Sequence, residues 1–509
     1  MKIYTAEQMK AVDTETIAGY GIDGLLLMEH AAMAVQKEVL RALGGCGGNV
    51  LVVCGKGNNG GDGFAAARLL DGRCGSVCAA FFDDPAQLRG DAAKNYALMS
   101  GLGIEVVRDM ETFAARLAEC DVVVDALYGF GFHGELAGRD RQIAEQINAA
   151  GKYVIAVDMP SGVGADTGVC DYAVRADKTV TFTGYKPAQL LFPAASYCGE
   201  TVVEDIGIPR QVSGKSGVGE TITRGFVRAA LPLRARNAHK GTCGKVLVVG
   251  GSRGMGGAVC MSARSALRSG AGLVTVGVPR CLNDIVQQKI SEAMTLPLPE
   301  DEAGHLSEAA APELIQFAQG YDTVVFGPGI GRSGAIVTLL REILKLNKRV
   351  VIDADGLYAL AQDIGMLQEK QAEVVVTPHH AEMARLVGAT AAEVEPHAIE
   401  TAKAFAQKQN VTVVLKGAYT VVAGGQCYVN NSAGNAGMAT AGSGDVLSGV
   451  VGALLYRAAD CTQAAACAVY LHALAGDAAQ RRFGTESMTA GDLTESLPEA
   501  FRLCKEEHA

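Results

Sequence analysis

The amino-acid sequence predicts an α/β protein with two domains, each built on a parallel β-sheet that is buried on both faces. The chain has 509 residues, more than a single hydrophobic core usually serves. Short apolar runs alternate with helical patterns along its length, which is typical of parallel sheets covered by helices. Near the middle, residues 210–224 read RQVSGKSGVGETITR, a polar stretch without periodicity that indicates a linker.

The predicted strands are the apolar runs between the helical patterns. In the first half they cover residues 50–54, 76–82, 121–127, 153–159 and 178–184. In the second half they cover residues 245–251, 273–278, 322–327, 349–354, 373–378 and 412–417. Both halves are of ordinary domain size. We therefore expect a first domain over residues 1–212, a linker over 213–223 and a second domain over 224–509.

The composition excludes several classes of function. The formal net charge is −10, whereas a general binder of nucleic acid or of membrane surfaces needs a basic field, so neither is an expected partner. No apolar run approaches the ~20 residues that cross a membrane, and the first residues lack the pattern of a secretory leader. The 14 cysteines are scattered, without the paired CxxC units of a zinc site. We expect a cytoplasmic protein with reduced thiols.

Three predicted strands of the first half end in polar residues. GNNGGDG follows the first strand, Asp125 lies at the end of DVVVDAL, and VDMPSG brings Asp158 and Ser161 to the end of a third strand. Ligands bind outside the carboxyl ends of parallel strands, so these side chains are expected at one site. Asn59, Asp125 and Ser161 offer only oxygen donors, which suit a hard cation of low charge.

The glycines of GNNGGDG indicate a close approach to a phosphate. Gly60, Gly61 and Gly63 would let backbone amides reach the ligand, and a helix expected to begin near Phe64 would aim its positive end there. The spacing fits neither the GxGxxG of a dinucleotide fold nor a Walker loop. Simpler explanations stay open: a Gly-rich tight turn, Asp125 as a cap, and MPSG as a proline turn. Three polar strand ends in one sheet favour a site.

GNNGGDG, DALYGFG and VDMPSG resemble the three motifs of the NAD(P)H-hydrate epimerase family, over residues 1–210. The resemblance implies a Rossmann-like three-layer domain that interconverts the two epimers of hydrated NAD(P)H. It also implies that Asn59, Asp125 and Ser161 hold potassium. The substrate contacts that it implies are Asn58, Asn59, Gly60, Gly61, Asp62, Gly129, Phe130, Gly131, Phe132, His133, Gly134, Glu135 and Asp158.

Epimerisation at C6 of the hydrated ring, a carbinolamine carbon, needs only proton transfers. Hydroxide leaves with help from the ring nitrogen, and water returns on the other face. One carboxylate of suitable pKa is enough, and Asp158 is the candidate. A purely electrostatic or ligand-positioning role for Asp158 stays open, as does a first half that is only a binding or scaffold module.

The second half contains the stretch NSAGNAGMATAGSGDVLSGVVGALL. AGSGD precedes an apolar helical run, which places the amides of Ser443 and Gly444 at a helix N-terminus and Asp445 in its first turn. Such a terminus stabilises phosphate oxygens while the carboxylate accepts a proton from an attacking hydroxyl. The alternative is that Asp445 is an ordinary acidic residue at the start of a helix.

Other strand ends of the second half carry candidate ligand contacts. VLKGAYTVV places Lys416 and Thr420 around a turn, where they are either nucleotide-phosphate contacts or the tip of a β-hairpin. GGSRGMGGA, FGPGIG and VTPHHAE also follow predicted strands. A lone histidine such as His379 is most often at the surface or satisfied by its own neighbours.

GGSRGMGGA, SGAGLVTV, GPGIG, DADGL, TPHHAEMARL, KGAYTVV and NAGMATAGSGDVLSG together resemble the ribokinase-like superfamily, and within it the NAD(P)H-hydrate dehydratase family. The resemblance implies that Asp445 activates the C6 hydroxyl, which takes a phosphoryl group and then leaves as phosphate. It also implies ADP with Mg²⁺, giving AMP; no residue distinguishes ADP from ATP on physical grounds. The implied substrate contacts are Ala258, Gly329, His379 and Asp445, and the implied nucleotide contacts are Lys416, Gly417, Ala418, Tyr419, Thr420 and Gly444.

The sequence therefore predicts a two-domain repair enzyme with a Rossmann-like first domain and a ribokinase-like second domain. The first would equilibrate the R and S hydrates, and the second would return the S form to NADH or NADPH. The expected partners are the hydrates NADHX and NADPHX, ADP, and further copies of the chain in a homo-oligomer. The rival hypothesis is a ribokinase-like kinase of a small molecule such as a vitamin precursor, with the first half as a ligand sensor.

Overall fold

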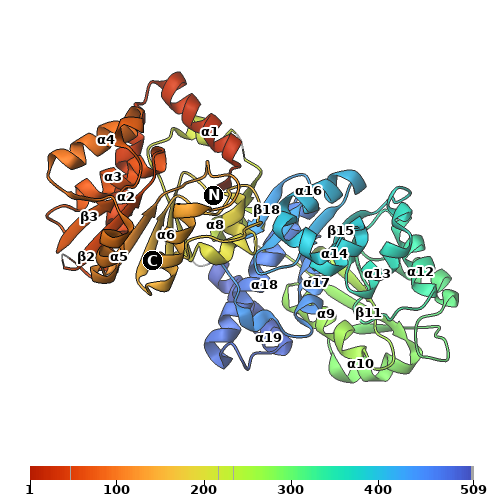
Figure 1. Ribbon diagram of the computed structural model, residues 1–509. Helices are drawn as coiled ribbons and strands as arrows, with labels where there is room; N and C mark the ends of the chain where they lie inside the picture. The colour runs from red at the N-terminus through yellow and green to blue at the C-terminus, as the bar shows by residue number, and fades with distance from the viewer. Residues whose placement is uncertain (46, 216, 233, 506–509) are drawn as a thin grey trace. The chain divides into compact units, whose positions relative to one another are not determined.

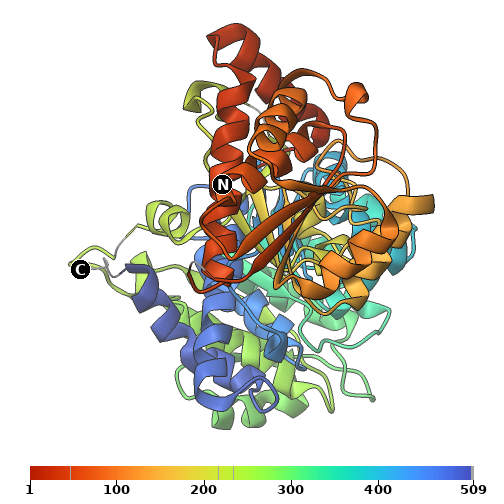
Figure 2. The same cartoon turned by 60° about the vertical axis from the view of Figure 1, so that its left-hand side comes forward.

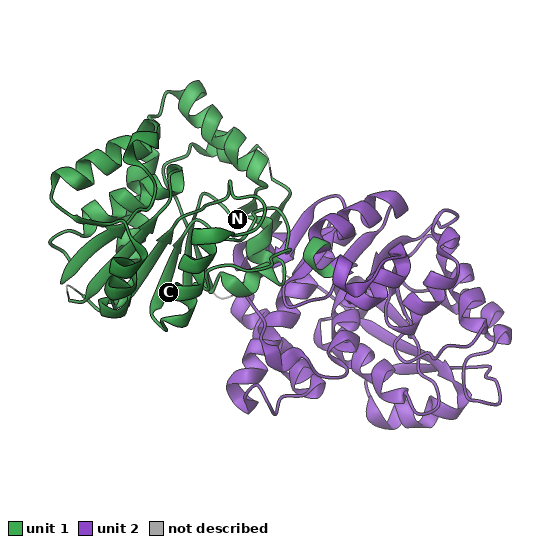
Figure 3. Ribbon diagram, viewed as in Figure 1, with its two compact units in different colours: residues 1–220, 395–397 green, residues 221–394, 398–509 purple. Residues whose placement is uncertain are grey.

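The computed structural model describes residues 1–45, 47–215, 217–232 and 234–505. The chain divides into two compact units, one over residues 1–220 with 395–397 and the other over residues 221–394 with 398–509 (Figure 3). Residue 216 of the predicted linker and residues 506–509 of the predicted second domain lie outside the described residues.

The segment predicted as a linker contains regular structure. Gly219–Thr221 forms strand β9, which pairs antiparallel with strand β1 (Lys2–Ile3) at the start of the chain. The Nζ atom of Lys2 lies 2.7 Å from Oε1 of Glu220 across this pair. A strand of this length is too short to give a periodic pattern, so the sequence alone did not indicate it.

The first unit is a parallel sheet between two helical layers (Figures 1 and 2). Its strands are β2 (Asn49–Cys54), β3 (Ser76–Ala80), β4 (Glu105–Val107), β5 (Val122–Ala126), β6 (Tyr153–Val157), β7 (Lys178–Phe182) and β8 (Glu200–Glu204). Its helices are α1 (Ala6–Thr14), α2 (Gly24–Ala42), α3 (Asn58–Leu70), α4 (Gly90–Gly101), α5 (Met110–Glu119), α6 (Gly138–Ala149) and α7 (Arg210–Ser213).

Alternate residues of the central strand β2 pack on opposite faces of this sheet, whose strand order is β4-β3-β2-β5-β6-β7-β8. Val50 and Val52 join the core formed with α2 and α3, whereas Leu51 and Val53 join the core formed with α5 and α6. Both sets are buried because side chains alternate along a strand and both faces are covered. The carboxyl ends of β2, β5 and β6 therefore meet at one edge.

The second unit has the same layered plan. Its strands are β10 (Lys245–Val249), β11 (Leu273–Pro279), β12 (Met294–Leu298), β13 (Thr323–Phe326), β14 (Arg349–Ile352), β15 (Glu373–Val376), β16 (Thr412–Leu415), β17 (Thr420–Ala423) and β18 (Cys427–Asn430). Its helices are α8 (Arg224–Ala230), α9 (Gly256–Arg268), α10 (Asn283–Lys289), α11 (Ala311–Ala318), α12 (Ala335–Leu344), α13 (Asp355–Gln362), α14 (His380–Val387), α15 (Ala391–Val394), α16 (Ala398–Gln409), α17 (Ser443–Leu454), α18 (Cys461–Phe483) and α19 (Ala490–Lys505).

The strands of the second unit follow the order β12-β11-β10-β13-β14-β15-β16-β17-β18, parallel up to β16. β16, β17 and β18 pair antiparallel as consecutive hairpins. Helices α9, α17, α18 and α19 share one core with Val246 and Val248 of β10. Helices α11 to α14 contact one another in chain order outside that core (Figure 1).

The predicted fold class is confirmed in both units, and each predicted apolar run contains a strand. Strands β4, β8 and β12 were not predicted because their residues are partly exposed and include charged or polar positions, so they form no continuous apolar run. All cysteines of the described residues are free thiols. Within the described ranges, no helix combines the length and the apolar character needed to cross a bilayer.

Candidate active sites

Helix α3 begins at Asn58 rather than near Phe64, so GNNGGDG forms its first turns instead of a loop before it. Gly57 is the N-cap residue, and the amide of Gly61 donates to the carbonyl oxygen of Gly57 at 3.1 Å. Asparagine and glycine have low helix propensity, which is why the sequence pattern placed the start too late. Asn58 and Asn59 thus lie at the positive end of a helix.

Close packing requires glycine at three positions of this helix. A Cβ atom on Gly60 would lie 1.7 Å from the carbonyl oxygen of Gly55, and one on Gly63 would lie 2.6 Å from the Cβ of Ala126. A Cβ on Gly61 would lie 2.8 Å from the side chain of Met28. Glycine at these positions therefore lets α3 pack closely against its neighbours, and that these glycines also admit a ligand stays a prediction.

We expect Gly60→Ala to lower the free energy of unfolding of the first unit by about 3 kcal/mol, because the added methyl group meets backbone that cannot yield. Chemical denaturation measures it. The matched control is Gly101→Ala, at the end of α4, where an added Cβ meets nothing within 4 Å. The control is expected to change stability by less than about 1 kcal/mol. Equal stability of the two variants would contradict the packing argument.

A cavity of about 720 Å³ opens at the carboxyl ends of β2, β5 and β6. Helices α1 and α2 contribute to its lining as well. The predicted substrate contacts that line it are Asn58, Asn59, Asp62, Gly129, Phe130, Gly131, Phe132 and Asp158. Gly60 and Gly61 are buried and lie outside this lining, as do the exposed residues His133, Gly134 and Glu135. The structure therefore brings most of the three motifs to one cavity.

Asp158 lies in this cavity with a left-handed backbone (φ 63°) directly after β6. Its Oδ1 atom lies 2.5 Å from Nζ of Lys186 and accepts a hydrogen bond from Oγ1 of Thr181 at 3.0 Å. Its Oδ2 atom accepts from the amide of Phe130 at 3.0 Å. A non-glycine residue at positive φ is strained and is characteristic of functional sites.

Lys186 is the partner of Asp158 that the sequence did not reveal. Its side chain is only 1% exposed, and its Nζ atom also donates to Oγ1 of Thr181 at 2.8 Å and to the carbonyl oxygen of Phe182 at 3.3 Å. A buried ammonium group needs such partners, because removing one leaves an uncompensated charge. Lys186 follows β7 in the stretch TGYKP. This is a fourth strand with a polar residue after its end, and that pattern was the signal in the sequence that could have revealed Lys186.

Asp125 and Ser161 contact each other beneath the cavity. Oδ2 of Asp125 accepts from the amide of Ser161 at 2.7 Å, and Oδ1 accepts from its hydroxyl at 2.5 Å. Burial raises the pKa of Asp125 to about 6, and these hydrogen bonds oppose the rise. Among the described residues no cationic side chain pairs with Asp125. A buried carboxyl without a counter-charge, beside hydroxyl oxygen, is an environment that a monovalent cation fits.

Asn59, at the start of α3, lies close to Gly129 and Asp158. A Cβ atom on Gly129 would be 2.8 Å from Oδ1 of Asn59 and 3.3 Å from Oδ2 of Asp158, so the three residues are neighbours. The Nδ2 atom of Asn59 is buried without a hydrogen-bond partner within the described part of the chain. Buried polar atoms are normally satisfied, so this amide indicates a ligand contact.

In the second unit, Asp445 lies in the first turn of α17, as predicted. The N-cap residue Gly442 has φ 92° and would place a Cβ 2.5 Å from the side chain of Met261, so glycine is required there. Burial, then the charge of Asp353, raise the pKa of Asp445 to about 7, while Lys416 opposes the rise. Asp445 can therefore exchange a proton near neutral pH.

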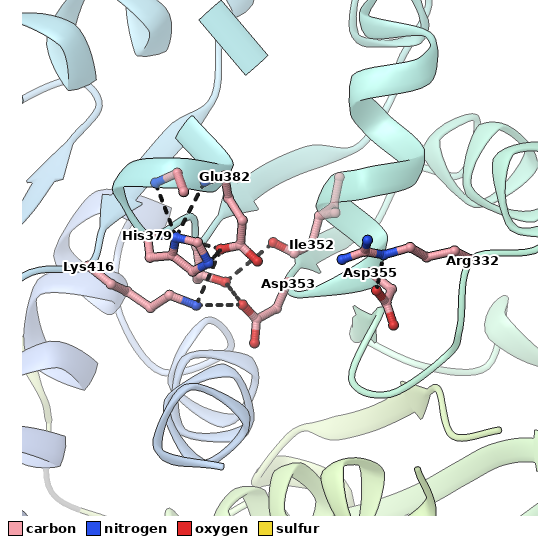
Figure 4. A network of polar contacts seen from close by, with 9 residues as sticks. Arg332, Ile352, Asp353, Asp355, His379, Glu382 and Lys416 are labelled. Atoms are coloured by element: carbon pink, nitrogen blue, oxygen red, sulfur yellow. Dashed lines mark hydrogen bonds and ion pairs between the residues drawn. The ribbon is translucent and has the colours of Figure 1, made fainter. Parts of the chain in front are cut away.

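Lys416 joins this helix end to a network of polar side chains (Figure 4). Its Nζ atom lies 2.9 Å from Oδ1 of Asp353, which also accepts from the hydroxyl of Thr377 at 2.7 Å. A Cβ atom on Gly444 would lie 3.3 Å from Nζ of Lys416. The ammonium group therefore lies against the first turn of α17, beside the amides that an anion would bind. The sequence motif DADGL contained Asp353, but its role was not predicted.

The segment around Lys416 is a β-hairpin, which was the alternative left open by the sequence. β16 and β17 pair antiparallel, with Val413 opposite Ala423, and Gly417 and Ala418 are exposed in the turn. The hydroxyl of Thr420 donates to the carbonyl oxygen of Gly417 at 3.3 Å. The hairpin and the nucleotide contact are compatible, because Lys416 points from the hairpin toward α17 while the turn stays open.

His379 is the N-cap residue of α14. Its Nδ1 atom accepts from the amides of Ala381 and Glu382 at 3.1 and 3.4 Å, and its own amide donates to Oε2 of Glu382 at 2.9 Å (Figure 4). This reciprocal pattern is a capping box in which histidine replaces the usual hydroxyl residue. The Nε2 atom lies 3.5 Å from Oε2 of Glu382, and the histidine side chain is 54% exposed.

The two remaining predicted substrate contacts of this unit are neighbours. Gly329 has φ 61°, and a Cβ atom there would lie 3.0 Å from that of Ala258 and 2.6 Å from the carbonyl oxygen of Met255. The hydroxyl of Ser252 donates to the carbonyl oxygen of Gly329 at 2.9 Å. This hydrogen bond and the close contacts of Gly329 hold the loops after β10 and β13 together.

Both units are α/β folds with polar residues at the strand ends of the sheet. In the second unit, a helix N-terminus also lies beside a lysine. These features define a two-domain enzyme that acts on nucleotides. Residues 246–499 match the profile of NAD(P)H-hydrate dehydratase, and residues 24–188 match that of the YjeF-related protein N-terminus. The bifunctional NAD(P)H-hydrate repair enzyme Nnr of Moorella thermoacetica is 40% identical, over 100% of this chain and 98% of that protein. The corresponding enzyme of Thermofilum pendens is 37% identical, over 100% of this chain and 97% of that protein.

A solved structure, hypothetic protein SMU.573 from Streptococcus mutans, covers 56% of this chain and 100% of its own, with 25% identity and a TM-score of 0.50. The chain belongs to the family of bifunctional NAD(P)H-hydrate repair enzymes. The family resemblance predicted from the motifs is confirmed for both halves, and the relatives favour repair over a kinase with a ligand-sensing half.

Proposed function

We propose that the first unit interconverts the R and S hydrates of NADH and NADPH, and that the second unit dehydrates the S form with ADP, giving AMP and phosphate. The observation that carries the proposal is an acidic residue at each site: Asp158, which accepts hydrogen bonds from Lys186 and the amide of Phe130, and Asp445, which lies at the start of α17 near Lys416. The two units complement each other, because damage forms both epimers and the dehydratase takes one.

In the first unit, the cavity would take the hydrated nicotinamide half of the coenzyme. Asp158 would face the altered ring, and Phe130 with the residues that follow it would contact the pyrophosphate. Asn59, Asp125 and Ser161 would hold potassium, whose positive charge would offset the buried Asp125 carboxylate. Asn59 would also use its unpartnered Nδ2 atom on the substrate.

In the second unit, Asp445 would remove the proton of the C6 hydroxyl while the terminal phosphoryl group of ADP moves to that oxygen. Phosphate then leaves as the ring nitrogen donates its electron pair, and loss of a proton from C5 restores the double bond. Lys416 and the amides of Ser443 and Gly444 would bind the phosphate oxygens. Mg²⁺ bound with the nucleotide would neutralise charge on the phosphates. Phosphate is a far better leaving group than hydroxide, which explains the use of a nucleotide.

The test of this function is the fate of the phosphoryl group. With the S hydrate of NADH, ADP and Mg²⁺, we expect inorganic phosphate and NADH to appear in equal amounts. A phosphate assay measures the first product, and the absorbance of NADH measures the second. A stable phosphorylated alcohol that accumulates instead would support a small-molecule kinase.

The dehydratase is expected to gain activity as pH rises through about 7, because Asp445 must be deprotonated to act as a base. Lys416→Met should move this limb of the kcat/KM profile up by about one pH unit, since the lysine lowers the pKa of Asp445. The control is Lys408→Met on the exposed side of α16, which should leave the limb in place. If this limb of the kcat/KM profile does not move in Lys416→Met, Asp445 is not the group whose titration the profile reports.

A further inference from the structure

Helix α1 places an acidic residue, Asp13, in the lining of the first unit's cavity. Thr5 and Gln8 form a capping box at its start, and Met9 and Val12 are buried in the core. Met9, Asp13 and Ile17 line the cavity. The chain then winds into a π-helix, Glu15–Gly19, a distortion that is frequent at functional sites. Asp13 was not among the residues that the sequence motifs indicated.

Asp13 faces the groups around Asp158 from a different wall. Lys186 and Asp158 act on it electrostatically from the loops after β7 and β6, and Asp62 does so from α3. Asp13 and Asp158 thus both interact with the ammonium group of Lys186, which lies 2.5 Å from Oδ1 of Asp158. Each carboxylate disfavours ionisation of the carboxyl groups beside it.

Two of these acids, Asp62 and Asp13, have raised pKa values. Burial, and next the charge of Asp158, raise the pKa of Asp62 well above its usual range. Burial raises the pKa of Asp13 to about 6, with Lys186 opposing and Asp158 assisting the rise. Asp13 can therefore both give and take a proton near pH 6.

Epimerisation needs proton transfer on two faces of one ring. When hydroxide leaves C6, the ring nitrogen forms an iminium ion that is planar at that carbon. Inversion requires water to add from the face opposite to the departing oxygen. A single carboxyl group on one wall reaches one face, so the geometry of the reaction favours two groups on different walls.

We propose that Asp13 and Asp158 form a two-residue proton-transfer pair, each serving one face of the hydrated ring. The inference rests on the proposed epimerase function of this unit. In one direction Asp13 protonates the departing hydroxyl, which leaves as water while the C6–N1 bond gains double-bond character. A second water adds to C6 from the other face and gives its proton to Asp158. The reverse reaction exchanges the two roles, and protons equilibrate through water between turnovers.

The test compares four forms of the full chain: wild type, Asp13→Asn, Asp13→Glu and Glu7→Gln. The substrate is purified R hydrate of NADH in buffer made with ¹⁸O-labelled water, and chromatography with mass spectrometry follows both the S epimer and the label. Glu7 is the matched control, because it is an exposed acid on the same helix. Dehydratase activity with S hydrate and thermal unfolding of each variant report on folding.

We expect Asp13→Asn to slow labelled S formation on the order of 10²-fold or more, and to remove the fall of rate as pH rises through about 6. Asp13→Glu should keep part of the rate and the pH dependence, and Glu7→Gln should match the wild type. Wild-type rate and pH profile in a folded Asp13→Asn would overturn the pair while leaving the epimerase function intact. A wild type that makes no S epimer would overturn the function itself, and inversion without ¹⁸O incorporation would overturn the water-exchange steps.

Discussion

Asp445→Asn is expected to reduce dehydration of the S hydrate on the order of 10³-fold, with little change in the binding of ADP. The asparagine keeps the shape of the side chain but cannot accept the proton of the C6 hydroxyl at any pH. The measurement is kcat at saturating ADP and Mg²⁺, together with the Kd of ADP by calorimetry. Epimerase activity of the variant should equal that of the wild type.

Unfolding of Asp445→Asn would also abolish dehydratase activity, but the direction of the pKa shift of Asp445 argues against unfolding. A carboxyl group whose pKa is raised from 3.8 to about 7 stabilises the folded state below its unfolded pKa, and this contribution is lost as pH rises through 7. At pH 8 the asparagine variant should therefore be at least as stable as the wild type. Asp284→Asn, an exposed acid in the first turn of α10, is the matched control and should keep full activity. Full activity of Asp445→Asn would remove the proposed base.

Asp158→Asn is expected to slow epimerisation on the order of 10³-fold, so that only the S fraction of a mixed hydrate returns rapidly to NADH. The remaining R hydrate would then disappear at the rate of its uncatalysed epimerisation. The time course of NADH absorbance, with excess ADP and Mg²⁺, separates the two phases. Asp171→Asn, at an exposed position of the same unit, should show the single fast phase of the wild type.

Loss of Asp158 also leaves Lys186 buried without its carboxylate, which destabilises a protein by about 3–5 kcal/mol. The double variant Asp158→Asn with Lys186→Met removes both charges and should regain most of that stability. We expect the double variant to remain without epimerase activity although it folds. Epimerase activity restored in the double variant would show that Asp158 only balances the lysine.

The strand ends of both sheets could be predicted because buried parallel strands are continuous apolar runs, and polar residues after such runs stand out. That pattern located Asn59, Asp125 and Asp158, and the AGSGD stretch before an apolar helical run located Asp445. It could not show that Asp125 and Ser161 contact each other, since register and loop path decide that distance.

The residues that were missed share one physical reason: their roles depend on tertiary contacts. Asp13 lies in an ordinary amphipathic helix and reaches the cavity only because α1 packs across the sheet end. Lys186 follows β7 without a recognisable motif, yet it is almost fully buried against Asp158. The start of α3 was placed late because Asn and Gly disfavour helices, and packing of Gly60 on Gly55 outweighs that preference.

The central claim is that each unit binds the damaged coenzyme, with Asp158 at one altered ring and Asp445 at the other. The most direct test is a crystal structure of Asp445→Asn with the S hydrate, ADP and Mg²⁺. We predict a hydrate in the cavity between α1 and the strand ends, a second hydrate beside residue 445, and the phosphates of ADP at the start of α17. A structure in which both places are empty and the ligands are bound elsewhere on the chain would contradict the claim.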